Sequence, residues 1–179
     1  TGPACAIDTA CSSALVAAHM ARAEMILGLF EDACVGGINV ILRPTVTEQF
    51  NRAGMLSPSG RCQTLDAAAD GYVRAEACGL LRLVLTKQSF EYMANFCESR
   101  VNQDGRSSSL TAPNGPSQME VVIACQQNGA FDAHLHGTGT PLGDPIEVNA
   151  LLARCSVVRI EASKSWIGHA EPASGIISI

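Results

Sequence analysis

The sequence predicts an α/β fold with a mostly parallel sheet, and three observations carry this prediction. Continuous apolar runs, typical of buried strands, alternate with stretches whose apolar residues recur at helical spacing. Of the 179 residues, 47% are hydrophobic but only 4% are aromatic. Small aliphatic side chains suit close packing of helices on a sheet. The length suits one domain.

The first half predicts one long helix and two strands. Residues 4–10 form a short apolar segment, broken by Asp8 and Thr9, that leads as a short strand into a helix beginning at Cys11. Continuous apolar runs predict buried strands over residues 33–42 and 78–85. Residues 51–71 are rich in Gly, Ser, Pro and Asp, and we expect them to form a long surface loop.

The second half repeats this alternation after a polar loop over residues 102–116. Pro116 and Pro145 each stand where a helix can begin, because proline suits the first helical turn. The remaining elements are expected in the order helix to about 127, strand 131–136, helix to 154, strand 157–162 and turn 163–169. Two similar halves in sequence indicate a pseudo-duplicated architecture.

Charge and hydropathy argue against two classes of partner. The net charge is −5 and the basic residues are scattered, so we expect no nucleic-acid partner. No run of about 18 apolar residues occurs, so we expect no membrane span. The chain begins Thr1-Gly2-Pro3 without a signal peptide, and it looks cut at both ends. We expect a cytoplasmic location, with an upstream targeting sequence left open.

The eight cysteines form neither a zinc pattern nor a disulfide framework. They include no CxxC pair, and several lie in apolar runs, so we expect most to be reduced, buried side chains. A reducing compartment follows. His134 and His136 lie at strand period two and could share a metal, but no third ligand has suitable spacing. We therefore predict no metal site.

Cys11 is the best candidate for a nucleophile. It lies in DTACSS, residues 8–13, where an apolar segment ends and a long helix begins. A helix N-terminus carries partial positive charge and free N–H groups, which can lower the pKa of a cysteine. Position alone leaves a buried structural cysteine as the alternative.

Three further motifs follow DTACSS along the chain. They are NQDGRS with LTAPNGPSQ over residues 102–118, HGTGTPLGDPIE over 136–147, and KSWIGH over 164–169. Together the four motifs, in this order, resemble those of the β-ketoacyl synthases (ketosynthases) of polyketide and fatty-acid synthases. The third motif matches without a mismatch, and the resemblance spans nearly the whole chain. Two departures are Trp166 in place of the family's Asn and His134 in place of its usual Glu.

The resemblance implies a thiolase-like layered fold with two pseudo-duplicated halves, incomplete at both ends. Residues 1–85 would belong to the N-terminal half and residues 86–179 to the C-terminal half. Three connections are also shorter than the family pattern. Because the chain looks cut at both ends and the sheet would lack neighbouring strands, we expect the isolated chain to fold poorly or to associate. Bulky Trp166 is expected to pack beside the turn that aims His169, or to displace it.

A reaction is also implied by the resemblance. Cys11 would accept an acyl group from a carrier-protein or coenzyme A thioester. His136 and His169 would bind the carbonyl of a malonyl-type thioester, promote decarboxylation and stabilise the enolate. The carbanion would attack the acyl-Cys11 thioester in a Claisen condensation. Neutral imidazole suits this work, because it can donate a hydrogen bond to a developing oxyanion.

Four more residues acquire roles by the same resemblance. Lys164 and Glu147 would order the site behind the histidines, and Thr138 and Thr140 would contact the phosphopantetheine arm. No cofactor would be bound directly, since the substrates arrive on phosphopantetheine of acyl carrier protein or on coenzyme A. The expected partners are acyl carrier protein, acyl and malonyl-type thioesters and, as a homodimer, a second copy of the full-length parent.

Two other readings remain open at this point. The first is a non-catalytic or degenerate ketosynthase-like module that binds acyl carriers, favoured by the shortened connections and Trp166. The second is a Cys–His hydrolase, for which Cys11 and His136 would be the minimum. The loops over residues 102–118 and 136–147 are not needed by a hydrolase.

Overall fold

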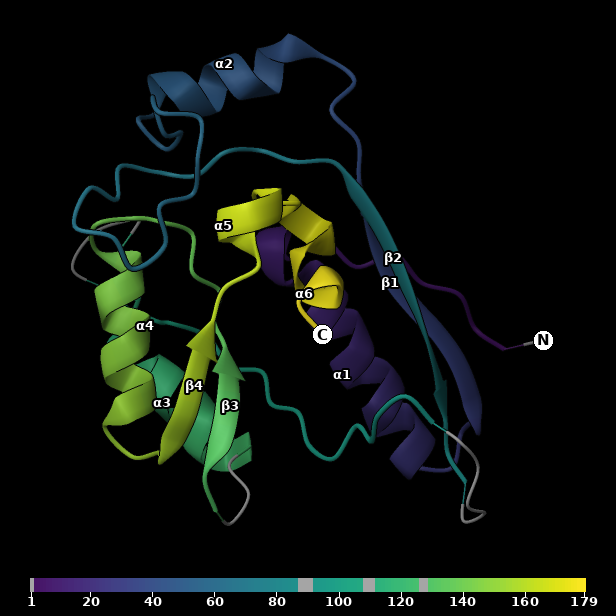
Figure 1. Ribbon diagram of the computed structural model, residues 1–179. Helices are drawn as coiled ribbons and strands as arrows, with labels where there is room; N and C mark the ends of the chain where they lie inside the picture. The colour runs from purple at the N-terminus through teal and green to yellow at the C-terminus, as the bar shows by residue number, and fades with distance from the viewer. Residues whose placement is uncertain (1, 87–91, 108–111, 126–128) are drawn as a thin grey trace.

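The computed structural model describes residues 2–86, 92–107, 112–125 and 129–179, and it has the predicted α/β character. Its elements form two groups that lie side by side (Figure 1). The first group contains α1 (Ser13–Ile26), β1 (Asp32–Asn39) and β2 (Ala77–Val84). The second contains α3 (Gly115–Cys125), β3 (Phe131–His134), α4 (Gly143–Leu152) and β4 (Val157–Glu161).

The prediction of a mostly parallel sheet is wrong for one of the two sheets. β3 and β4 are parallel, as expected, because α4 carries the chain back between them. β1 and β2 are antiparallel, with Asn39 opposite Ala77. Between them lie α2 (Pro44–Arg52) and the long connection 53–76, which ends beside the end of β1. β2 must therefore run back along β1 in the opposite direction.

The strands are also less buried than the apolar runs predict. Only Val35 and Asn39 are buried in β1, and β2 alternates half-buried with exposed positions. One face of this sheet packs on α1, where Ala18 and Ala21 contact Val35. A second apolar cluster centres on Ala133, Leu135 and Leu151 and joins β3 and β4 to α3 and α4. Each sheet thus has its own small core.

Several shorter segments differ from expectation. Residues 2–9 form no strand, and the expected turn at 163–169 contains a short helix, α5 (Lys164–Ile167). Of the loops expected over residues 51–71 and 102–116, the described residues 53–71 and 102–107 are confirmed as irregular, whereas residues 51–52 end α2 and residues 115–116 begin α3. The predicted end of α3 near residue 127 and part of the LTAPNGPSQ loop lie outside the described residues. No helix among the described residues is long and apolar enough to cross a membrane.

The last segment of the chain packs against the first sheet through a glycine. η2 (Glu171–Ala173) and α6 (Ser174–Ile177) follow α5 and contact both the first sheet and α1. A Cβ at Gly37 of β1 would come within 2.7 Å of the Pro172 carbonyl oxygen and 2.8 Å of Ala173 Cα. Only glycine permits this approach. It places residues 169–174 beside the start of α1.

Candidate functional site

Cys11 lies in a tight helical turn immediately before α1. The turn, η1 (Ala10–Ser12), begins at Ala10, whose φ of 55° is left-handed and unusual for a residue with a side chain. The Asp8 carboxylate accepts a hydrogen bond from the Ala10 N–H at 3.1 Å, and Ser13 Oγ donates to the Ala10 carbonyl at 2.6 Å. These local hydrogen bonds hold Cys11, which is half-buried, just before the N-terminus of α1.

The predicted lowering of the Cys11 pKa is not found. Burial raises the pKa of the Cys11 thiol above its ordinary value, and this effect exceeds the lowering by its backbone hydrogen bond and by the charge of Lys164. Cys11 precedes the first residue of α1, Ser13, and sits within a cavity wall. The loss of hydration therefore raises the pKa of the thiol by more than its position near the helix N-terminus lowers it. The resting nucleophile is a thiol.

The two predicted histidines converge on Cys11. The sulfur and one ring nitrogen of each histidine all lie within 4.8 Å of one another. The rings of His136 and His169 meet edge to face, with centroids 5.4 Å apart. These three residues come from η1, the loop after β3 and the loop after α5, so the two groups of elements meet here. His136 and His169, which follow Cys11 by 125 and 158 residues, are thus brought into one site with it.

This cluster opens into a cavity of ≈ 1310 Å³. Six of the seven predicted site residues line it, namely Cys11, His136, Thr138, Thr140, Glu147 and His169. The hydroxyl oxygens of Thr138 and Thr140 are 3.3 Å apart, and Thr140 Oγ1 also accepts from the Gly143 N–H at 3.1 Å. The cavity is large enough to admit an extended thioester chain beside Cys11.

Glu147 fixes the loop that carries His136. Its carboxylate accepts hydrogen bonds from the backbone N–H groups of His136 (2.5 Å) and Gly137 (2.9 Å). Asp144, which is buried, ties the same loop to the 53–76 connection by accepting from the N–H groups of Gly139 and Leu65. Glu147 thus acts on the main chain of the loop, and not on the imidazole.

The ring of His136 faces the open cavity but is crowded by protein elsewhere. This burial, with the nearby charges of Lys164 and His169, lowers the pKa of His136 to about 3. The ring is therefore neutral near pH 7, the form expected for a hydrogen-bond donor to a developing oxyanion.

His169 is buried, and its protonation state is fixed by its neighbours. Its Nδ1 accepts a hydrogen bond from the Glu171 N–H at 2.9 Å and lies 2.7 Å from Ser174 Oγ. A backbone N–H can only donate, so Nδ1 carries no proton and the neutral ring holds its proton on Nε2. Burial and the charge of Lys164 lower the pKa of His169 to about 4. The ring can offer Nε2–H to a ligand.

Lys164 is the seventh predicted residue and lies behind the cavity. It is the first residue of α5, and only 3% of its surface is exposed. Burial lowers the pKa of Lys164, while Glu147 and Cys11 oppose this effect. Burial also raises the pKa of Glu147, with the charge of Lys164 acting in the opposite direction. The two side chains therefore stabilise each other's charge.

The cluster has the residue types of a metal site, but its hydrogen bonds oppose one. Cys11, His136 and His169 are close enough to share an ion. The proton on His169 Nε2 and the donors at Nδ1 leave that ring without a free lone pair. His134, which the sequence also allowed as a ligand, accepts a hydrogen bond from the Ser163 N–H at 3.2 Å through Nε2. A carboxylate at that position could accept the same bond.

The expectation that Trp166 packs beside the turn of His169, or displaces it, is wrong. The side chain of Trp166 is 84% exposed and neither fills nor displaces the turn. His169 keeps both hydrogen bonds at Nδ1 and pairs with the main chain of residues 73–75. The indole points away because α5 turns that residue outward. The departure from the family's Asn therefore leaves both hydrogen bonds of His169 in place.

Two contributors to the site were not found from the sequence. Tyr72 packs its ring 5.0 Å from that of His169, and burial raises its pKa to about 12. Arg74 pairs with Glu171 next to the same histidine. Both lie in the segment DGYVRAE, residues 70–76, which follows the polar loop. Its aromatic and basic residues, placed just before a strand, were the available signal.

Comparisons with known proteins agree across the whole chain. Residues 1–90 match the family model of the β-ketoacyl synthase N-terminal domain, and residues 93–179 match that of the C-terminal domain. The chain is 43% identical over 98% of its length to the phenolphthiocerol/phthiocerol polyketide synthase subunits B and A of Mycobacterium tuberculosis. It spans 12% and 10% of those two proteins.

Solved structures give the same result. A ketosynthase from module 6 of the bacillaene synthase of Bacillus subtilis matches 99% of the chain with a TM-score of 0.85 and 35% identity. An oxazolomycin ketosynthase domain from Streptomyces albus matches with a TM-score of 0.83 and 31% identity. The chain covers 34% of each of those structures.

Proposed function

Since this chain belongs to the β-ketoacyl synthase family, we propose that it carries the reaction centre of a polyketide-type ketosynthase. It transfers an acyl group to Cys11 and then condenses that group with a malonyl-type thioester. The convergence of Cys11, His136 and His169 within 4.8 Å is the observation that carries the proposal. Residues 1–85 and 86–179 are assigned to the N- and C-terminal halves of that enzyme.

In the first step, the Cys11 sulfur attacks the carbonyl carbon of the incoming acyl thioester. The backbone N–H of Cys11 in η1 donates to the oxyanion that forms. The tetrahedral intermediate collapses, the carrier thiolate leaves, and the proton from Cys11 goes to it. Because burial raises the pKa of Cys11, this proton must be lost during the step and not before it.

In the second step, the malonyl-type thioester enters the same cavity. Nε2–H of His169 and the neutral ring of His136 donate to its thioester carbonyl oxygen. The bond to the carboxylate breaks, CO₂ leaves, and the electron pair becomes an enolate held by these donors. The enolate carbon attacks the acyl-Cys11 carbonyl. A carbon–carbon bond forms, Cys11 is released, and the product is a β-ketoacyl thioester.

The remaining residues serve the substrate and the electrostatics of this reaction. Thr138 and Thr140 offer hydroxyls in the cavity to the amides of a phosphopantetheine arm. That arm belongs to acyl carrier protein or coenzyme A, and no other cofactor takes part. Lys164 and Glu147 stabilise each other's charged form behind the histidines. Assembly as a homodimer and a cytoplasmic location are part of the same proposal.

The proposal is tested by separating loading from decarboxylation in the full-length protein that carries this chain. His136→Ala and His169→Ala should leave acylation of Cys11 intact, measured by mass spectrometry of the acylated peptide. Release of CO₂ from a malonyl thioester should fall by at least roughly 10²-fold, the low end for loss of a positioned donor. If either variant lost loading and kept CO₂ release, the assignment of roles would be wrong.

A further inference from the structure

The main chain of His169 is held by the segment that precedes β2. The His169 N–H donates to the Val73 carbonyl at 2.7 Å, and its carbonyl accepts from the Ala75 N–H at 2.9 Å. Arg74 lies between these two partners and forms an isolated bridge with His169. The backbone of Arg74 is therefore held directly beside His169.

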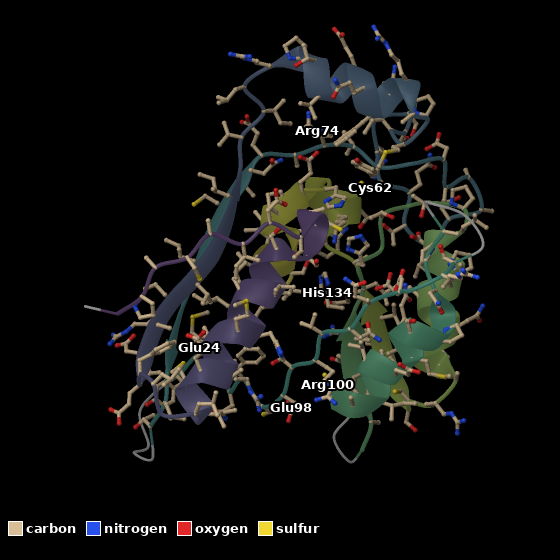
Figure 2. The ribbon with its side chains drawn as sticks, turned by 180° about the vertical axis from the view of Figure 1, so that it is seen from behind. Glu24, Cys62, Arg74, Glu98, Arg100 and His134 are labelled. Carbon is tan, nitrogen blue, oxygen red and sulfur yellow. The ribbon has the colours of Figure 1, made fainter. Side chains whose placement is uncertain are left out.

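The guanidinium of Arg74 is enclosed by three partners. Two of its nitrogens donate to the two oxygens of Glu171, and the Nη2–Oε2 distance is 3.0 Å. Nη1 donates to Thr47 Oγ1 at 2.6 Å, and the group lies over the ring of Phe50, 5.4 Å from its centroid. Thr47 and Phe50 belong to α2, which covers Arg74 in Figure 2. Side-chain exposure is only 7% for Arg74 and 19% for Glu171.

Glu171 is in turn the residue that fixes the tautomer of His169. Its φ of 45° is left-handed, a conformation that a residue with a Cβ avoids unless its surroundings impose it. In that conformation its N–H points at His169 Nδ1, 2.9 Å away. The forked pair with Arg74 is the contact that pins the Glu171 side chain, and such paired charge-assisted bonds are geometrically specific.

We propose that Arg74 is a positioning residue for His169: by clamping Glu171 in its left-handed conformation, it keeps the Glu171 N–H on Nδ1 and thus the proton on Nε2. This inference rests on the proposed function, because it supplies the donor that His169 offers to the enolate. Arg74 touches neither substrate nor the reacting atoms. Its effect should therefore fall on decarboxylation and spare the loading of Cys11.

The Arg74–Glu171 pair, here called the clamp, also affects how readily His169 takes up a proton. Protonated Nδ1 would face the Glu171 N–H, donor against donor, so the clamp opposes the imidazolium form. The other titratable groups around His169 are Cys11, Tyr72, His136 and Lys164. Of these, charged Lys164 also opposes the imidazolium form, whereas the other three are neutral. Loss of the clamp leaves these groups in place and removes only the opposing donor.

The test compares Arg74→Ala, Arg74→Lys and Glu171→Gln in the full-length protein that carries this chain. Arg82→Ala is the matched control, because Arg82 also pairs with a carboxylate, that of Asp32, but at an exposed site on the first sheet. Release of CO₂ from malonyl thioester should fall at least ~10-fold in Arg74→Ala, less than the ~10²-fold that a 1 Å misplacement can cost. Acylation of Cys11 should stay unchanged, and Arg74→Lys should recover part of the loss.

A pH profile provides the second readout. The acidic limb of CO₂ release should lie near the His169 pKa of about 4 in the parent. In Arg74→Ala it should move to higher pH, because the donor that opposes protonation of Nδ1 is lost while burial and Lys164 continue to lower the pKa, and a purely structural role would not give this shift. If Arg74→Ala fails to fold, Glu171→Gln and Arg74→Lys decide the matter by the same two measurements.

Two results would overturn the inference. One is unchanged CO₂ release and an unmoved acidic limb in folded variants, and the other is an equal fall in loading and decarboxylation, which indicates general damage. A failure of the proposed function is recognised separately, because His169→Ala would then leave CO₂ release unchanged.

Discussion

At the scale of single residues, the site keeps its histidines neutral by crowding them with protein and by the nearby charge of Lys164. The pKa of His136 is lowered to about 3 and that of His169 to about 4, against about 6.5 for an exposed histidine. The unfolded chain thus binds more protons than the folded chain between about pH 4 and pH 6.5. The free energy of unfolding of this region should rise with pH across that window and fall as the pH drops through it.

Hydrogen exchange can measure this dependence in the full-length protein. The protection factor of the peptide spanning residues 164–179, which corrects for intrinsic exchange, should decrease as the pH is lowered from about 6.5 to about 4. His169→Gln removes the titrating ring and should flatten the dependence. His19→Gln, a histidine of α1 outside the site, should not. An equal slope in both variants would refute the link to His169.

A second residue-scale prediction concerns the selectivity of Cys11. Four of the cysteines are exposed, whereas Cys11 is half-buried with a raised pKa. General alkylation of Cys11 should therefore rise only at a pH above that needed for free cysteine, and exposed Cys34 and Cys78 should react first. An acyl-thioester donor should instead label Cys11, because the cavity places it there. Acyl transfer to Cys34 or Cys78 at the same rate would show that the cavity confers no selectivity.

At the scale of elements, the fit between β1 and η2 controls the second histidine. Gly37→Ala would place a Cβ against the main chain of Pro172 and Ala173, neither of which can rotate away. We expect a loss of about 1–3 kcal/mol in stability from this overpacking. Decarboxylation should also fall more than loading, because η2 carries Glu171.

The control for that substitution is Gly115→Ala at the start of α3. Its Cβ would meet Ile146 at 3.5 Å, an ordinary contact. Thermal unfolding and the two half-reactions should be nearly unchanged in this variant. Equal effects of the two substitutions would mean that the close approach at Gly37 does not govern the site.

The elements were predicted correctly from the sequence where residues close together in the chain determine them. The helix after Cys11 and the helix at Pro145 are confirmed, since spacing and proline placement mark them. The antiparallel pairing of β1 and β2 was missed, because strand direction depends on where a long connection returns. Arg74 was missed for a similar reason, since its partners Thr47 and Glu171 are 27 and 97 residues away.

At the scale of the molecule, the predicted thiolase-like fold is confirmed by the solved ketosynthases, of which the chain covers about a third. Cys11 precedes α1 and His136 precedes α4, so each half presents its reactive residue in front of a helix. This common placement explains why residues distant in sequence meet, since the two groups of elements face each other at these helix starts. The site lies where neither group could form it alone.

The first sheet leaves an apolar surface that bears on the isolated chain. Ile38 and Leu80 are 61% and 74% exposed, and Leu42, beyond β1, is 84% exposed. Surfaces of this kind on a two-stranded sheet favour association. The 179-residue chain on its own should therefore form oligomers in sedimentation velocity experiments, and Leu80→Lys should shift them toward monomer. A monodisperse monomer without that substitution would contradict the expectation.

Trp166 has a consequence for observing the site. It is the chain's single tryptophan, it is 84% exposed, and it stands between Lys164 and His169. Its fluorescence should therefore emit at the long wavelengths of a hydrated indole and be quenched readily by acrylamide. Any molecule that covers α5 would shift this emission to shorter wavelengths and shield it from the quencher. The substitution that departs from the family motif thus equips α5 with an intrinsic optical reporter.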